Sequence, residues 1–247
     1  MPPVNPAPQH ANGSSLAGAA LRLETALALL RHAGRPEPGG AVGSDHYLQA
    51  LIDQLVELTS RDPLTGLSNR RSFELSLARE VDRVARSGDS ALLLMVDIDH
   101  FKKVNDTHGH GAGDQVIRAV AQALADSVRP MDLVARIGGE EFAVLLPNCP
   151  AAFAPQVASR VREKVARTLV ALAAGQSVAV TVSVGGAFAP QWVRSTPVLW
   201  MERADVQLYR AKDEGRNRVC LEPSAVSEVS ADERDLLLSA PPTLEVE

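Results

Sequence analysis

The stretch Gly138-Gly139-Glu140-Glu141-Phe142 lies between two short runs that are typical of β-strands. Residues 132–136 (Asp-Leu-Val-Ala-Arg) precede it, and residues 142–147 (Phe-Ala-Val-Leu-Leu-Pro) follow it. A glycine pair between such runs predicts a tight hairpin, because glycine adopts positive φ without steric cost. The backbone of a glycine can also lie directly against a ligand. We therefore expect two antiparallel strands joined by a turn that displays carboxylates.

The two acids of this turn are expected to do different work. Successive strand residues point to opposite faces, so Glu140 and Glu141 should diverge rather than chelate one ion together. This arrangement makes one acid a candidate metal ligand and leaves the other for a second task. The alternative is a polar turn with two solvated acids. The turn alone does not distinguish these interpretations.

The composition is that of an ordinary globular protein. The chain has 247 residues, of which 45% are hydrophobic and 22% charged, and its net charge is -5. A chain of this size buries enough surface to fold without disulfides, and its negative charge argues against nucleic-acid binding. Cys149 and Cys220 have no pairing pattern and fit a reducing compartment. With no long apolar run and no secretion signal, the prediction is a cytoplasmic protein without membrane insertion.

Four regions are expected along the chain. Residues 1–17 are rich in Pro, Ala and Gly and predict a disordered N-terminus, and residues 18–60 predict two helices separated by a linker at 35–40. Residues 61–221 form the main domain, and residues 222–247, with seven acids and one arginine, predict an acidic flexible tail. The second helix carries leucines in steps of three and four: Leu48, Leu51, Leu55 and Leu58. Their spacing fits a coiled-coil signalling helix, and equally a helix packed on its own domain.

The main domain alternates helical and strand patterns. Helices are expected at 70–86, 112–127, 151–174 and 196–212, and strands at 91–97, 132–136, 142–147, 178–185 and 218–221. Alternating elements with one antiparallel hairpin predict an α/β fold, in which a mixed central sheet of about five strands is flanked by helices.

The segment from Asp97 to Lys103 follows a short apolar strand that ends in acid. Magnesium prefers near-octahedral oxygen ligands and usually takes only one or two carboxylates from the protein. Asp97 at the strand exit and Glu140 at the hairpin tip can supply that pair. We interpret Asp99 as the N-cap of the next helix. Lys102 lies within a turn of the acids and suits the charge that builds on a phosphate in transit.

Residues 105–114 (Asn-Asp-Thr-His-Gly-His-Gly-Ala-Gly-Asp) predict an irregular turn followed by a helix from about Asp114. The two histidines lack the further His or Cys ligands that a zinc site needs. Asn105 and Asp114 are better interpreted as readers of a base edge, since a carboxylate can accept from both N–H groups of guanine. Capping and turn chemistry is the alternative explanation of these polar residues.

Five collinear segments together resemble the GGDEF family of diguanylate cyclases: 62–70, 97–102, 105–114, 136–142 and 204–218. The resemblance covers about residues 60–221. It implies a palm-like sheet of the nucleotidyl-cyclase type, and a reaction in which two GTP form cyclic di-GMP and two pyrophosphates across a homodimer. Mg²⁺ is the implied metal, with Mn²⁺ as a substitute. Gln207 stands where alanine is usual in the family, and we interpret it as a surface change.

The resemblance also implies residue roles. Glu140 resembles the proton acceptor and Lys102 the stabiliser of the transition state, while Glu141 either holds the hairpin or touches a second metal. The metal site resembles one made by Asp97, the carbonyl of Ile98 and Glu140. The substrate contacts implied by position are Asn105, His110, Asp114, Gly138, Gly139, Lys212 and Arg216.

A second site is implied by Arg129 and Asp132, which lie just before the signature at an offset similar to that of the family's product-inhibition site. Arginine can grip phosphate or the guanine Hoogsteen edge with two donors. Arg160, on the next predicted helix, resembles a further contributor. Alone, Arg129 would be explained by a helix C-terminus, where cations are favoured. The alternative function is a catalytically silent member that binds cyclic di-GMP through this site.

Overall fold

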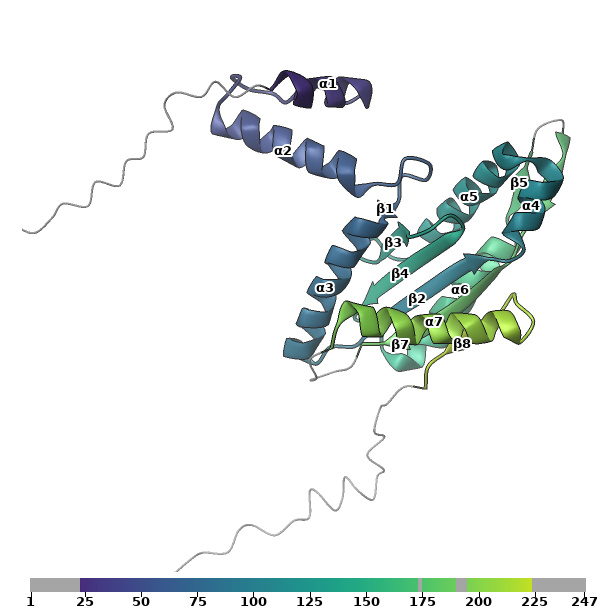
Figure 1. Cartoon of the computed structure of the whole chain (residues 1–247). Helices are drawn as coiled ribbons and strands as arrows, with labels where there is room; N and C mark the ends of the chain where they lie inside the picture. Colours follow the sequence, from purple (N-terminus) through teal and green to yellow (C-terminus); the bar gives the residue numbers. More distant parts are fainter. Residues whose placement is uncertain (1–22, 173–174, 190–194, 224–247) are drawn as a thin grey trace, which may run out of the picture. The chain divides into compact units, whose positions relative to one another are not determined.

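The structure is a computed structural model that describes residues 23–172, 175–189 and 195–223 (Figure 1). The expectations for residues 1–17 and for most of the tail lie outside this part of the chain. Contacts divide the chain into two compact units, Met1–Thr59 and Ser60–Glu247. No helix in the described ranges combines the length and the apolar character that crossing a membrane requires.

The first unit is a helical hairpin. It consists of α1 (Glu24–His32) and α2 (Asp45–Ser60). Leu30 of α1 is fully buried against Tyr47 and Leu51 of α2, and the other leucines of the α2 seam are partly buried against the same cluster. An ion pair of 2.9 Å between Arg35 and Glu57 joins the linker to α2. The leucine seam of α2 therefore faces α1.

The second unit is built on a six-stranded sheet. Its strands are β1 (Ser68–Asn69), β2 (Ala91–Ile98), β3 (Leu133–Arg136), β4 (Glu141–Pro147), β7 (Val182–Phe188) and β8 (Val219–Leu221). The strand order is β1-β3-β4-β2-β7-β8. The outer pairs β1/β3 and β7/β8 are parallel, and the three inner pairs are antiparallel. The predicted α/β fold with a mixed central sheet is confirmed.

Helices cover both faces of this sheet (Figure 1). From the central strand β2, Leu92 and Leu94 belong to the core shared with α4 (Phe101–His108), α5 (His110–Ala125) and α6 (Ala154–Ala166). Leu93 belongs to the opposite core, which contains α3 (Arg70–Ser87) and α7 (Pro197–Asp213). Every residue of β2 is buried. Burial on both faces explains why its sequence is a continuous apolar run rather than an alternation.

Two expectations about the elements were wrong. The helix predicted over 151–174 is a short 3-10 turn, η1 (Ala151–Phe153), followed by α6, which ends at Ala166. Beyond it, β5 (Leu169–Ala171) pairs with β6 (Ser177–Ala179) as a separate two-stranded sheet. The run predicted as one strand over 178–185 is divided between β6 and β7. Val170 of β5 and Val180, between β6 and β7, are buried in the main core. The burial of Val170 favours a strand in a stretch whose spacing also fitted a helix.

Candidate active site

The predicted acids meet at one end of the sheet. β2 ends at Ile98, and its neighbour β4 begins at Glu141, which is the register partner of Asp97. The main-chain N–H of Ile98 donates to the carbonyl of Glu140 at 3.3 Å. Sheet pairing therefore brings Asp97 and Ile98 next to Glu140 and Glu141, although more than forty positions separate them in the sequence.

The signature turn is closed by hydrogen bonds rather than by unusual glycine dihedrals. The N–H groups of Ile137 and Gly138 both donate to the carbonyl of Glu141, at 3.0 and 3.3 Å. Neither Gly138 nor Gly139 has positive φ, so the expected reason for the glycine pair was wrong. A Cβ on Gly138 would overlap with the carboxylate of Glu141, whereas a Cβ on Gly139 would meet nothing within 4 Å. The overlap at Gly138 is with the end of a flexible, exposed side chain, which can move aside.

The side chain of Arg136 holds this turn in place through hydrogen bonds. Its Nε and Nη2 donate to the carbonyl of Gly139 at 3.1 and 2.8 Å, and its Nη1 lies 3.2 Å from both carboxylate oxygens of Asp62. Asp62 also accepts from the N–H and hydroxyl of Thr65. Burial raises the pKa of Asp62, but the hydrogen bonds from Thr65 and Arg136 outweigh it, so the pKa lies below its ordinary value. Asp62 and Arg136 both lie in the segments that resemble the family, but no role was predicted for either residue.

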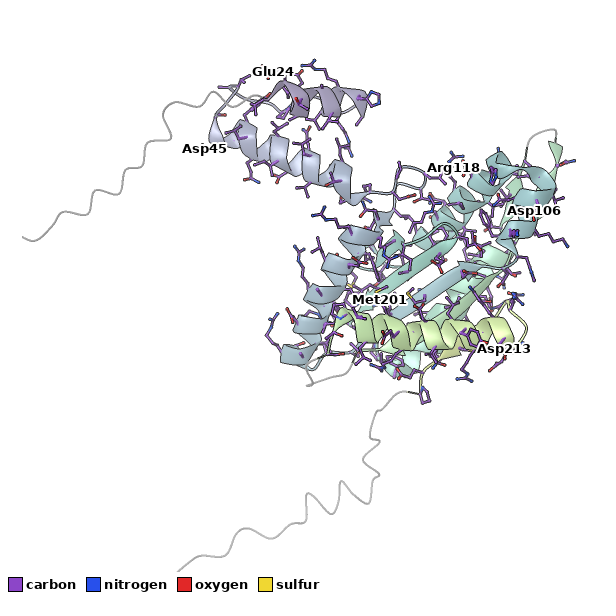
Figure 2. The ribbon with its side chains drawn as sticks, viewed as in Figure 1. Glu24, Asp45, Asp106, Arg118, Met201 and Asp213 are labelled. Atoms are coloured by element: carbon purple, nitrogen blue, oxygen red, sulfur yellow. The ribbon has the colours of Figure 1, made fainter. Side chains whose placement is uncertain are left out.

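Helix α7 delivers a lysine to the acids. Nζ of Lys212 lies 2.8 Å from Oδ2 of Asp97. Burial raises the pKa of Asp97, the hydrogen bond and charge of Lys212 oppose this, and Glu141 adds to the rise. Figure 2 shows Asp213, at the end of α7, toward the same end of the domain as Asp106 on α4. Lys212, expected to contact phosphate, is therefore also the counter-ion of Asp97.

Two further acids contribute to the negative charge. Burial, together with the charge of Asp97, raises the pKa of Glu140. Burial and the charge of Glu141 raise the pKa of Asp205 on α7. Asp205 belongs to a quoted motif but was not predicted as a site residue. The cluster carries more negative charge than Lys212 can balance, which favours binding of a cation.

The donor set fits a hard metal ion. The carboxylates of Asp97 and Glu140 and the carbonyl of Ile98 are oxygen ligands of the kind that Mg²⁺ prefers. Within the described ranges, no group of three or more His, Cys, Asp or Glu side chains is arranged to hold a metal ion. A cation at this end of the sheet would therefore need additional oxygens from a substrate and from water, as is usual for Mg²⁺.

The residues predicted to contact a base lie on α4 and α5. Asn105 packs against α5, because a Cβ on Gly113 would overlap with its side-chain oxygen. Lys102, His110 and Asp114 are exposed. The predicted start of α5 near Asp114 was too late, since the helix begins at His110. Exposure leaves the three side chains accessible to a ligand.

Two smaller interpretations were wrong. The N-cap of α4 is His100, at φ 56°, and it makes no side-chain capping bond. The carboxylate of Asp99 is instead buried among side chains from β7 and its approach. Gln207 is not a surface residue: it is only 8% exposed, and it accepts a hydrogen bond from Arg210.

The three residues of the predicted second site line one small pocket. Arg129, Asp132 and Arg160 share it with Cys149 and Phe153, among other residues. Oδ2 of Asp132 accepts from the N–H of Arg129 at 2.8 Å, and Nε of Arg160 donates to the carbonyl of Ser127 at 2.9 Å. Burial raises the pKa of Asp132, and the charges of Arg129 and Arg160 oppose this.

Comparisons with known proteins agree with this geometry. The profile of the family described as "Diguanylate cyclase, GGDEF domain" matches residues 59–218. The response regulator PleD of Caulobacter vibrioides is 42% identical over 174 residues, which are 70% of this chain and 38% of PleD. The probable diguanylate cyclase DgcC of Escherichia coli is 40% identical over 166 residues, or 67% of this chain and 44% of DgcC. This chain thus spans less than half the length of these curated relatives.

One similar solved structure contains a coiled coil as well as a GGDEF domain. The coiled coil and GGDEF domain of DgcB from Caulobacter crescentus, in complex with c-di-GMP, superposes with a TM-score of 0.67 at 33% identity. The match covers 81% of this chain and 99% of that chain.

Proposed function

This chain belongs to the diguanylate cyclase GGDEF-domain family, and we propose that it condenses two GTP into cyclic di-GMP and two pyrophosphates. The observation that carries the proposal is the meeting of Asp97, Glu140 and Lys212 at one end of the sheet, where Lys212 lies 2.8 Å from Asp97. Acids with excess negative charge beside a cationic side chain suit nucleotidyl transfer, which depends on positioning and charge neutralisation.

Asp97, the carbonyl of Ile98 and Glu140 would hold Mg²⁺, or Mn²⁺ as a substitute. When bound, the metal polarises the α-phosphate and neutralises charge on the departing pyrophosphate. The 3′-hydroxyl of one GTP forms a bond to the α-phosphorus of the other, and the bond from that phosphorus to pyrophosphate breaks. Glu140 accepts the hydroxyl proton. Partial burial and the charge of Asp97 raise the pKa of Glu140, which makes its carboxylate a stronger base than an ordinary glutamate.

The remaining side chains bind and orient the nucleotide. Asn105, His110 and Asp114 contact guanine, and Lys102 stabilises charge in the transition state. Lys212 and Arg216 contact phosphate oxygens, and the main chain of Gly138 and Gly139 lies against the phosphates. Glu141 holds the hairpin, since its carboxylate lies over Gly138.

The reaction requires two copies of the chain. Each subunit presents one GTP, and the two active sites face each other across a homodimer, because one site cannot join two nucleotides symmetrically. In this proposal α2 brings the subunits together as a coiled coil, which requires its leucine seam to leave α1. Light scattering of residues 61–247 against the full chain tests this part, and an unchanged dimer would discard it.

The pocket of Arg129, Asp132 and Arg160 binds cyclic di-GMP as a feedback inhibitor. Two arginines and one carboxylate match the phosphates and the Watson-Crick edge of guanine. The presence of both metal-site acids and Lys102 favours an active enzyme over a silent receptor that uses this pocket alone.

The proposed function is tested by incubating the full chain with GTP and Mg²⁺ and identifying the product by mass. Cyclic di-GMP is expected with GTP and no cyclic dinucleotide with ATP. Binding of cyclic di-GMP without turnover would support the silent receptor.

A further inference from the structure

The carboxylate of Asp99 joins segments that are distant in the sequence. It is 5% exposed. Its Oδ1 accepts from the hydroxyl of Ser183 at 2.6 Å, and its Oδ2 accepts from the hydroxyl of Thr181 at 2.6 Å and from the main-chain N–H of Asn217 at 3.0 Å. Two residues earlier in the chain is Asp97, at the metal-binding end of β2. Asp99 therefore connects this end directly to the loop after α7.

The loop that donates the third hydrogen bond, through the N–H of Asn217, has an unfavourable backbone. Arg216 and Asn217 have φ of 64° and 46°, the left-handed region that residues other than glycine seldom adopt. Such a conformation persists only where surrounding contacts hold it. Here the N–H of Arg216 donates to the carbonyl of Ala211, and Oδ1 of Asn217 accepts from Nη1 of Arg162, both at 2.9 Å. The hydrogen bond from Asn217 to Asp99 ties this loop to the segment that directly follows β2.

We propose that Asp99 is a positioning residue, which fixes the loop of Arg216 and Asn217 relative to Asp97 so that Arg216 meets the nucleotide phosphates. The assignment rests on the proposed function. A carboxylate suits the task because it accepts hydrogen bonds only, and bonds to a charged acceptor are about twice as strong as neutral ones. A purely structural role is the competing explanation, since a buried acid with three donors also stabilises the fold.

Nucleotide affinity separates the two explanations. We would measure the Kd of 3′-deoxy-GTP with Mg²⁺ for the full chain, because this analogue lacks the attacking hydroxyl and cannot be condensed. Asp99→Ala is expected to raise the Kd by about tenfold, the usual loss for a charge-assisted contact, and Arg216→Ala by a similar factor. In the double variant the Kd should rise no further than in either single variant, because residues that act through one contact are not additive.

Ser183→Ala is the matched variant. It removes one donor from the same carboxylate and leaves the bond to Asn217, so it is expected to lower the Tm while the Kd changes less than threefold. Asp99→Asn replaces Asp99→Ala in the affinity measurement if the alanine variant does not fold. Its amide oxygen can still accept from Asn217 while its nitrogen donates to Ser183, so its Kd should lie closer to the wild-type value.

Three results would overturn the assignment alone: a Kd for Asp99→Ala within twofold of wild type, a double variant whose Kd rises by the product of the single effects, or a Ser183→Ala Kd as high as that of Asp99→Ala. If the wild-type chain does not bind the analogue, the proposed function fails and this assignment falls with it. If wild type binds it but makes no cyclic di-GMP from GTP, the proposed function fails while the variants still test Asp99.

Discussion

Asp62 and Arg136 form a paired brace under the signature turn, with Nη1 of the arginine 3.2 Å from both oxygens of the carboxylate. Both side chains are 16% exposed, so solvent screens the pair only partly. The same guanidinium donates to the carbonyl of Gly139. The segment that opens the second unit thereby fixes the position of the turn that carries Glu140.

Replacing Asp62 tests this brace. Asp62→Asn keeps the shape but removes the charge opposite Arg136, and the loss of a charge-assisted hydrogen bond costs about 1–3 kcal/mol. For a domain of this size the Tm should fall by about 2–10 °C, and cyclic di-GMP formation should fall with it because the turn loses its support. The control is Asp53→Asn in α2, an exposed acid of the other unit. Equal Tm values for the Asp62→Asn and Asp53→Asn variants would contradict a stabilising contact between Asp62 and Arg136.

Protons are expected to compete with the metal. The pKa values of Asp97 and Glu140 lie above their ordinary values, chiefly because Asp97 is buried and Glu140 is partly buried. Only the deprotonated carboxylates bind a cation, so affinity should begin to fall at a higher pH than for ordinary acids. The stabilisation of the chain by Mg²⁺ together with 3′-deoxy-GTP, measured as a Tm shift, should therefore shrink as the pH is lowered from 7 to 5. Asp97→Asn should show little stabilisation at either pH, and a pH-independent shift in wild type would exclude this account.

Gly185 lets α7 lie directly on β7. A Cβ there would overlap with the main chain at Leu208 and Ala204, and the backbone cannot move aside without shifting the helix that carries Lys212. Gly185→Ala should cost about 1–3 kcal/mol and should lower activity. Gly111→Ala on α5, where a Cβ meets nothing within 4 Å, is the control and should leave the Tm unchanged or slightly higher, since alanine favours helix. Similar Tm losses in both variants would argue against a specific contact at Gly185.

Feedback by the product should depend on Arg129. Arg129→Ala removes one guanidinium from the pocket of Asp132 and Arg160, and cyclic di-GMP should then inhibit at about tenfold or more higher concentration. The uninhibited rate should stay near wild type. Initial rates measured at increasing concentrations of cyclic di-GMP check this prediction. The control is Arg167→Ala, which changes a largely exposed arginine at the C-terminal end of α6. Identical inhibition of wild type and Arg129→Ala would remove the pocket from the regulatory scheme.

The sequence predicted what depends on local pattern. The apolar run at 91–97 and the helical spacing at 70–86 correspond to β2 and α3, because the core dictates both patterns. The family resemblance is likewise confirmed. The short strand β5 was missed and β6 was merged with β7, because three-residue strands carry too few positions for a period to be seen.

Long-range contacts could not be predicted. Asp99 meets partners 82 to 118 positions away, and its neighbours in sequence suggested a helix cap instead. The same holds for Gln207, whose burial depends on how α7 packs, and for Gly138, which has no positive φ and lies against the side chain of Glu141. Such roles follow from which strands pair, and a motif does not contain that information.

The most direct measurement of the central claim is product formation by Glu140→Gln beside wild type, in the presence of GTP and Mg²⁺. The exchange keeps the size of the side chain and removes a metal ligand and proton acceptor in one change, at a half-buried position. We expect a folded variant with an unchanged Tm and a loss of at least about 100-fold in rate, the usual contribution of a general base. Cyclic di-GMP at a rate near that of wild type would contradict the account.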